Sequence, residues 1–224
     1  DVNAVLLVVT SSDRGLCGAF NSNIFKHTQN LIADKYSSIE ASGNLHIMPI
    51  GKRAYEYYKK RGYSIIETYC DLFNFLDFDH VRAAAEYTIE SFMSQEFDRI
   101  EIIYNEFKNV ATQIIRNEQF LPILSLESLE ETNIQNVDFI AEPNEVFIFN
   151  EIIPKSLKIQ FYKGLLESNA SEHGARMTAM GQATDNAGEL LKELKLTYNR
   201  TRQAAITKEI LEIVGGAEAL AKES

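Results

Sequence analysis

The sequence has few cysteines and no long apolar run. Its two cysteines, Cys17 and Cys70, form no CxxC pair among 224 residues. This excludes a disulfide framework and a cysteine-based zinc site, and it favours a reducing compartment. No apolar run reaches the roughly 18 to 20 residues that cross a bilayer. The apolar run at residues 4–9 lacks a basic flank, so it predicts a buried strand and not a signal peptide.

An excess of basic charge is also missing. The chain has 22 lysines and arginines against 32 acidic residues, which gives a net charge of −10. Proteins that bind nucleic acid or anionic membranes directly are expected to be basic, so both classes are disfavoured. Hydrophobic residues make up 45% of the chain, which is enough for a core. The length suits one sizeable domain, or one domain with an appendage.

Residues 1–142 alternate short apolar runs with amphipathic stretches. We expect Asn21 or Ser22 to cap the first helix and Asp79 to cap the third. The alternation predicts an α/β domain with a mainly parallel, five-stranded sheet and an antiparallel edge strand. Residues 126–137 are polar and predict a loop. Strands are predicted at residues 4–9, 45–50, 64–69, 100–104 and 113–118, and helices at 22–36, 51–58 and 81–97.

Residues 143–224 predict one very long C-terminal α-helix, because no proline follows Pro154 and strong helix formers dominate. The helix is expected to begin near Asn144 or to hold Pro154 in its first turn. Its candidate coiled-coil seam is too polar to stand alone and needs a partner helix that residues 1–142 do not supply. The seam comprises Tyr162, Leu166, Asn169, His173, Met177, Met180, Ala183 or Thr184, Ala187, Leu191 and Leu194.

The segment SSDRGLCG at residues 11–18 follows the first strand, where α/β proteins often place phosphate loops. It matches neither GxGxxG nor GxxxxGK[ST]. We therefore interpret Asp13, Arg14, Gly15, Cys17 and Gly18 as a structural loop, whose two glycines adopt conformations that side chains disfavour. Cys17 has no nearby histidine in the sequence, which favours a buried and inert thiol over a nucleophile.

Other polar residues indicate no catalytic or metal site. Asp71, Asp77 and Asp79 are too few for a metal site with defined spacing. Glu172 and Arg176 stand four residues apart and are expected to pair as solvated charges on a helix. The sequence thus predicts no metal, no cofactor and no catalytic residue.

Three segments resemble the ATP synthase γ subunit family, in the order that family shows. They are SSDRGLCGAFN (11–21), SEHGARMTAMGQATDNAGEL (171–190) and NRTRQAAITKEILEIVGGAEAL (199–220). The resemblance implies two long antiparallel helices in a coiled coil, with an α/β domain inserted between them. Because the present sequence starts at the first strand of that domain, the N-terminal helix that would supply the partner seam is expected to lie outside it.

The resemblance also implies a function. The γ subunit is the central rotor shaft of a rotary ATP synthase, which couples proton-driven rotation to conformational change at catalytic sites on the β subunits. The implied partners are the α and β subunits of the catalytic hexamer, the ε subunit and the membrane rotor ring. Arg176, Gln203, Thr207 and Glu209 match family positions that contact β-subunit loops. The implied location is peripheral, on the cytoplasmic face of the bacterial inner membrane or its matrix or stromal equivalent.

Two other hypotheses remain from the residues alone. The first is an enzyme that binds a small ligand near residues 14–18 and uses the helix to dimerise; it needs a pocket with convergent polar groups and a perturbed titratable group. The second is a structural coiled-coil adaptor, which needs a strongly apolar seam, unlike the one present.

Overall fold

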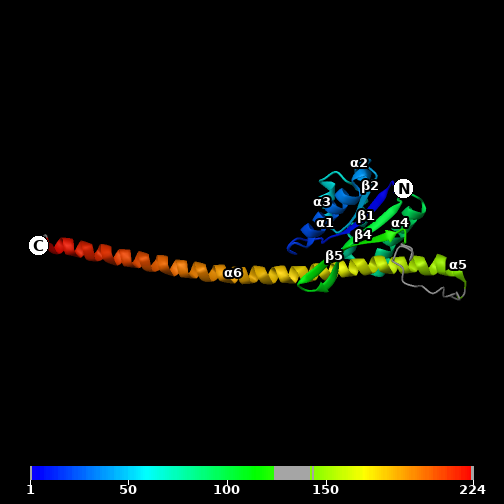
Figure 1. Ribbon diagram of the computed structural model, residues 1–224. Helices are drawn as coiled ribbons and strands as arrows, with labels where there is room; N and C mark the ends of the chain where they lie inside the picture. The colour runs from blue at the N-terminus through cyan, green and yellow to red at the C-terminus, as the bar shows by residue number, and fades with distance from the viewer. Residues whose placement is uncertain (1, 124–141, 143, 223–224) are drawn as a thin grey trace, which may run out of the picture. The chain divides into compact units, whose positions relative to one another are not determined.

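The computed structural model describes residues 2–123, 142 and 144–222 (Figure 1). The chain divides into two compact units, Asp1–Ala179 and Met180–Ser224. The loop predicted at residues 126–137 lies outside the described residues. The boundary between the units falls within the long helix, so the first turns of that helix belong to the same unit as the sheet.

The first unit contains a five-stranded sheet in the order β3-β2-β1-β4-β5. Strands β1 to β4 are parallel, and β5 pairs antiparallel with β4. This confirms the predicted mainly parallel sheet with an antiparallel edge. Every residue of β1 is buried, as its continuous apolar run predicts. The strands are β1 Val5–Thr10, β2 Leu45–Ile50, β3 Ser64–Ile65, β4 Arg99–Asn109 and β5 Thr112–Leu121.

Helices cover both faces of this sheet (Figure 1). Helices α1, α2 and α3 pack on one face, and α4 with the first part of α6 packs on the other. The helices are α1 Phe20–Lys35, α2 Ser37–Ala41, α3 Lys52–Lys59, α4 Phe78–Met93, α5 Glu145–Phe147 and α6 Ile153–Lys222. Short 3₁₀ turns lie at Glu67–Tyr69 and Leu72–Asn74, and a π-helical segment at Ile148–Ile152.

The start of α6 is part of the domain core. Leu157, Phe161 and Leu165 recur every four residues and are at most 8% exposed. They pack with Val81 and Ala85 of α4 against the sheet. Burying each large side chain contributes about 1.5–3 kcal/mol, so this stripe fixes the first turns of α6 firmly to the domain.

The coiled-coil seam predicted from the sequence lies on a different side of α6. Leu166 is 41% exposed and Met177 is 69% exposed, and His173 is exposed as well. Within the first unit, α6 therefore carries two stripes. One contacts the sheet, and the other is exposed at Leu166, His173 and Met177, while Tyr162 of the predicted seam packs against the core.

Several predicted boundaries were wrong. The third strand has two residues, because the chain turns into 3₁₀ helix after Ile65. Asp77, and not Asp79, caps α4: its carboxylate accepts a hydrogen bond from the backbone N–H of His80 at 2.9 Å. Neither Asn21 nor Ser22 caps α1, which has no side-chain cap; both residues lie inside it.

Pro154 lies in the first turn of α6, as one of the two predicted alternatives has it. Helical turns also precede it, from Glu145 onward, as the other alternative has it. Proline has no backbone N–H and cannot continue the regular α-helical ladder. The wider π-helical segment at Ile148–Ile152 lies directly before it, at the place where such an interruption is expected.

Candidate functional site at the loop after the first strand

The ends of β1 and β4 lie where the strand order of the sheet reverses. In α/β proteins this crevice is the usual place for a ligand. Here α6 occupies it. Ser168 Oγ donates to Thr10 Oγ1 at 3.1 Å, and Ser171 Oγ donates to the carbonyl oxygen of Asn105 at 3.0 Å. All four residues are at most 2% exposed, so the helix takes the space that an enzyme of this architecture gives to its substrate.

Two hollows on the first unit lie elsewhere. One of 470 Å³ lies beside β3, lined by Glu40, Arg61 and Tyr63 among others. Another of 370 Å³ is an apolar groove between α4, the end of β5 and the start of α6. Neither is lined by residues of the 11–18 segment, which the enzyme hypothesis requires.

Within the described part of the chain, no group of three or more His, Cys, Asp or Glu side chains could hold a metal ion. Nor is any described helix long and apolar enough to cross a membrane.

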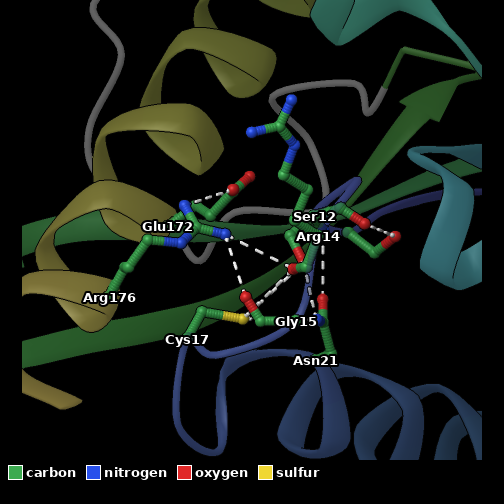
Figure 2. A network of polar contacts seen from close by, with 8 residues as sticks. Ser12, Arg14, Gly15, Cys17, Asn21, Glu172 and Arg176 are labelled. Atoms are coloured by element: carbon green, nitrogen blue, oxygen red, sulfur yellow. Dashed lines mark hydrogen bonds and ion pairs between the residues drawn. The ribbon is translucent and has the colours of Figure 1, made fainter. Parts of the chain in front are cut away.

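The loop between β1 and α1 is held by three anchors, and the first is Asn21 of α1 (Figure 2). Asn21 Oδ1 accepts from the backbone N–H of Ser12 at 3.0 Å, and Asn21 Nδ2 donates to Ser12 Oγ at 2.6 Å. Asn21 Nδ2 also lies 3.3 Å from Cys17 Sγ. Cys17 is 2% exposed and contacts a hydroxyl, an amide and a carbonyl, none of which is a base. The predicted burial of this thiol is confirmed.

The second anchor comes from the start of α3. Asp13 Oδ1 accepts from the backbone N–H of Lys52 at 3.0 Å, and Ser11 Oγ accepts from that of Ala54 at 2.8 Å. A carboxylate is favoured there by the positive end of the helix dipole. Gly51, just before α3, has φ +101° and passes so close that a Cβ atom would lie 2.2 Å from the carbonyl oxygen of Ser11. A side chain at Gly51 would therefore push the loop away.

The third anchor comes from α6, through Arg176 (Figure 2). Arg176 Nη1 donates to Glu172 Oε1 at 2.7 Å. Its Nη2 donates to the carbonyl oxygens of Arg14 at 3.3 Å and Gly15 at 3.4 Å. The side chains of Glu172 and Arg176 are 10% and 24% exposed. The expectation that this pair is solvated was wrong, because the loop covers it.

The tip of the loop has unusual backbone geometry. Gly18 has φ +60°, as predicted for a glycine that adopts a conformation side chains disfavour. Gly15 does not have a positive φ; the second such residue is Leu16, with φ +67°. A left-handed conformation costs a residue with a Cβ atom about 1–2 kcal/mol. The Leu16 side chain is 76% exposed, so the protein holds an apolar side chain out to solvent in a strained conformation.

Gln203, Thr207 and Glu209 lie in the second unit, where each is exposed. With 3.6 residues per turn, Gln203 and Thr207 share one side of α6 and Glu209 faces another. Exposed apolar side chains lie between them on the helix surface, including Ile206, which is 48% exposed, and Ile210, which is 55% exposed. The structure thus brings Arg14, Gly15 and Cys17 together with Arg176, and it leaves the other three as a separate exposed set.

A buried carboxylate on β4 was missed by the sequence reasoning. Glu101 is 1% exposed, accepts hydrogen bonds from Lys35 and Tyr36 of the α1 side, and accepts one from Asn117 of β5 at 2.9 Å. Burial alone would raise the pKa of Glu101, but these hydrogen bonds together hold that pKa below its usual value. The available signal was a lone acidic residue in the otherwise apolar run of β4.

Ser168 and Ser171 were missed as well; Ser168 and Glu172 continue the helical spacing of Leu157, Phe161 and Leu165.

Comparison with known proteins identifies the family. The family model described as ATP synthase matches residues 1–220. The ATP synthase gamma chain of Cytophaga hutchinsonii is 58% identical over 221 residues, which is 98% of this chain and 75% of that protein. The ATP synthase gamma chain of Chloroherpeton thalassium is 47% identical over 228 residues, with 98% of this chain and 75% of that protein covered.

Solved structures show the same fold. A chain in the mitochondrial ATP synthase of Euglena gracilis, from an OSCP/F1/c-ring structure, matches with a TM-score of 0.69 and 22% identity, covering 98% of this chain and 73% of that one. A chain in the central stalk and c-ring structure of the Tetrahymena thermophila mitochondrial enzyme matches with a TM-score of 0.59 and 24% identity, covering 82% and 78%. With its sheet, its long helix and nearly its whole length matched, the chain belongs to the ATP synthase gamma chain family.

Proposed function

We propose that this chain is the central rotor shaft of a rotary ATP synthase, and that it couples proton-driven rotation to conformational change at catalytic sites on the β subunits. The observation that carries this proposal is the 58% identity to an ATP synthase gamma chain over 98% of the present chain. The matching solved structures include an ATP synthase rotor from Euglena gracilis and a central stalk with its c-ring from Tetrahymena thermophila.

The construction of α6 supports a shaft. The helix has 70 residues, which corresponds to about 105 Å at 1.5 Å per residue. A shaft transmits torque only if the end that joins the α/β domain cannot turn relative to that domain. Phe161 and Leu165 are fully buried, and Ser168 and Ser171 form hydrogen bonds to the strand ends, so rotation of this part of α6 relative to the sheet would break all of these contacts.

We infer that the chain contributes no catalytic residue to ATP synthesis. Its α/β crevice is filled by α6, and polar groups of the 11–18 loop form hydrogen bonds with one another and with Asn21. In this proposal the chemistry takes place on the β subunits. The chain acts by changing the relative free energies of their conformations, because its interactions differ from one β subunit to the next.

The partners in this proposal are the α and β subunits of the catalytic hexamer, the ε subunit and the membrane rotor ring. Gln203, Thr207 and Glu209 would contact β-subunit loops from the exposed surface of α6, and Arg176 would act on the β subunits from the first unit. The exposed apolar residues Leu191, Leu194 and Ile210 are each more than half exposed, and such side chains favour a covering partner. The chain would be a peripheral component on the cytoplasmic face of the bacterial inner membrane, in keeping with its bacterial relatives.

Assembly tests this proposal. The protein would be expressed from its full-length gene together with the α and β subunits, and the native mass and ATPase rate of the complex would be measured. We expect one copy for every six large subunits. Gln203→Ala should lower the ATPase rate without loss of assembly, whereas Lys208→Gln, whose exposed side chain lies about 100° or more around the helix from each of the three contact residues, should leave it unchanged. A hexamer that never retains the chain would overturn the assignment.

A further inference from the structure

We propose that Arg176 and Glu172 form a latch that fixes the loop of residues 13–18 to α6, so that Arg176 influences coupling through the loop and not by touching a partner itself. This inference rests on the proposed rotor function, and it assigns Arg176 and Glu172 as positioning residues. The position of the loop tip, formed by Arg14, Gly15 and Leu16, is in this proposal what the latch sets.

The first argument is the use of the guanidinium donors. Arg176 directs Nη1 to Glu172 at 2.7 Å and Nη2 to two carbonyl oxygens of the loop. Only about a quarter of its side chain is exposed. A guanidinium is planar and its donors form a fixed fork, so a group that already binds three acceptors within its own chain is poorly free to bind a partner.

The second argument is the position of Glu172. It lies one helical turn before Arg176, is 8% exposed, and orients the guanidinium toward the loop. An almost buried carboxylate without its cation would be costly, so the two residues support each other. Neither charge was expected to be covered from the sequence; Glu172 is buried and Arg176 is three-quarters covered, because the loop lies over them.

The third argument is the strain in the loop tip. Leu16 adopts φ +67° and its side chain is 76% exposed, so packing of that side chain does not compensate for its conformation. The strain must be balanced by the anchors on either side: Ser12 with Asn21 at the start of α1, Asp13 with α3, and the two hydrogen bonds from Arg176. Strained residues that the surrounding structure holds in place occur most often at functional sites. The Arg176 bonds set the position of the tip relative to α6.

The test uses Cys17 as a reporter. It is part of the loop, its side chain is buried beneath the loop tip at 2% exposure, and the second cysteine would be removed by Cys70→Ser. The rate of Cys17 alkylation would be measured on the full-length chain in native buffer. Because hydrogen bonds to a charged group stabilise strongly, Arg176→Ala should speed alkylation about tenfold or more. Arg176→Lys should act in the same direction, since an ammonium group cannot reproduce the fork geometry.

Matched variants keep this result interpretable. Lys163→Ala removes an ion pair with Glu167 on the same helix, more than three turns before Arg176. It should leave alkylation unchanged. Glu172→Gln keeps the shape of the latch and provides a milder variant if Arg176→Ala fails to fold, and it should speed alkylation too. Unchanged alkylation in folded Arg176→Lys and Glu172→Gln proteins would overturn the latch. This readout needs no ATP synthase, so it is independent of the rotor assignment.

The coupling claim is tested in the assembled enzyme, as protons pumped per ATP hydrolysed. Arg176→Lys should lower this ratio. Leu16→Gly, which suits the positive φ and removes the exposed side chain, should lower it while Cys17 stays protected. If Arg176→Lys releases the loop and leaves the coupling ratio at the unsubstituted value, Arg176 does not act on coupling through the loop and the proposal fails.

Discussion

Replacing Glu101 with glutamine should destabilise the first unit by about 2 kcal/mol, a figure typical of charge-assisted hydrogen bonds. Glu101 is 1% exposed and lies on the α1 side of β4. One carboxylate oxygen accepts from Lys35 Nζ and from the Tyr36 hydroxyl, and the other accepts from Asn117 Nδ2 at 2.9 Å. These bonds connect α1, β4 and the edge strand β5.

The magnitude follows from what glutamine preserves. It keeps the shape and one acceptor oxygen for Lys35 and Tyr36, but it loses the negative charge and points an amide N–H₂ toward Asn117. Hydrogen bonds to charged groups contribute about 1.5–3 kcal/mol. Alanine should cost more, about 3–5 kcal/mol, because the buried Tyr36 hydroxyl would also lose its acceptor. Lys35, whose side chain is 41% exposed, can return to water and adds little to that loss.

The loss of unfolding free energy in the Glu101→Gln variant, relative to the unsubstituted chain, should depend on pH. Burial acts to raise the pKa of Glu101, but the hydrogen bonds from Lys35, Tyr36 and Asn117 outweigh it and lower that pKa in the folded state. The unfolded chain therefore binds the proton first as pH falls below about 4.3. The stabilisation by the Glu101 carboxylate is fully present above that pH, and it is lost as pH falls through the lowered folded value. The stability gap between the two proteins should shrink accordingly.

Urea unfolding at pH 7 and at steps from about pH 4 down to about pH 3 measures both effects, with the free energy of unfolding obtained by linear extrapolation. Glu106→Gln on the same strand is the control, because Glu106 pairs with Arg116 at the surface and should cost at most about 1 kcal/mol. A Glu101→Gln protein within about 0.5 kcal/mol of the unsubstituted chain at pH 7 would refute the reasoning, as surface substitutions commonly stay in that range.

Further substitutions test the fold at single points. Gly51→Ala should destabilise the fold by about 3 kcal/mol or more, because Gly51 has a positive φ and lies close to the Ser11 carbonyl. Gly43→Ala, where φ is also positive but the space around the residue is open, should cost only about 1–2 kcal/mol. Thermal unfolding of the two variants compares these losses. Asp77→Ala should lower the Tm by about 2–4 °C through loss of a helix cap, and Asp79→Ala should not, which calorimetry can check. Phe161→Ala, at 0% exposure between α6 and the sheet, should cost about 3–5 kcal/mol in urea unfolding; a smaller loss would mean that α6 is not held firmly.

The sheet could be predicted from the sequence because its strands are short apolar runs between amphipathic helices. The run at β1 is buried on both faces, and the lone antiparallel strand follows a tight turn after β4. The third strand was overestimated because the apolar residues after Ile65 pack as 3₁₀ turns and not as a strand, a distinction that apolar composition does not make.

The site could be predicted only in part. The sequence located the loop and Arg176, since each lies within a recognisable segment. It gave no sign that the guanidinium of Arg176 binds the carbonyl oxygens of Arg14 and Gly15, which lie 162 and 161 positions earlier in the chain. Backbone carbonyl groups are present at every residue, so such a contact leaves no pattern in the sequence. The same holds for Asn21, whose side chain was expected to cap a helix and instead binds Ser12.

Rotation of the chain inside the catalytic hexamer is the most direct test of the central claim. The full-length protein would be assembled with its α and β subunits, the hexamer fixed to a surface, and an optical probe attached to the α/β domain through a cysteine introduced at the exposed position of Lys60. On addition of ATP the account predicts that the probe turns continuously in one direction. Steady ATP hydrolysis by the hexamer while the probe stays fixed would contradict it.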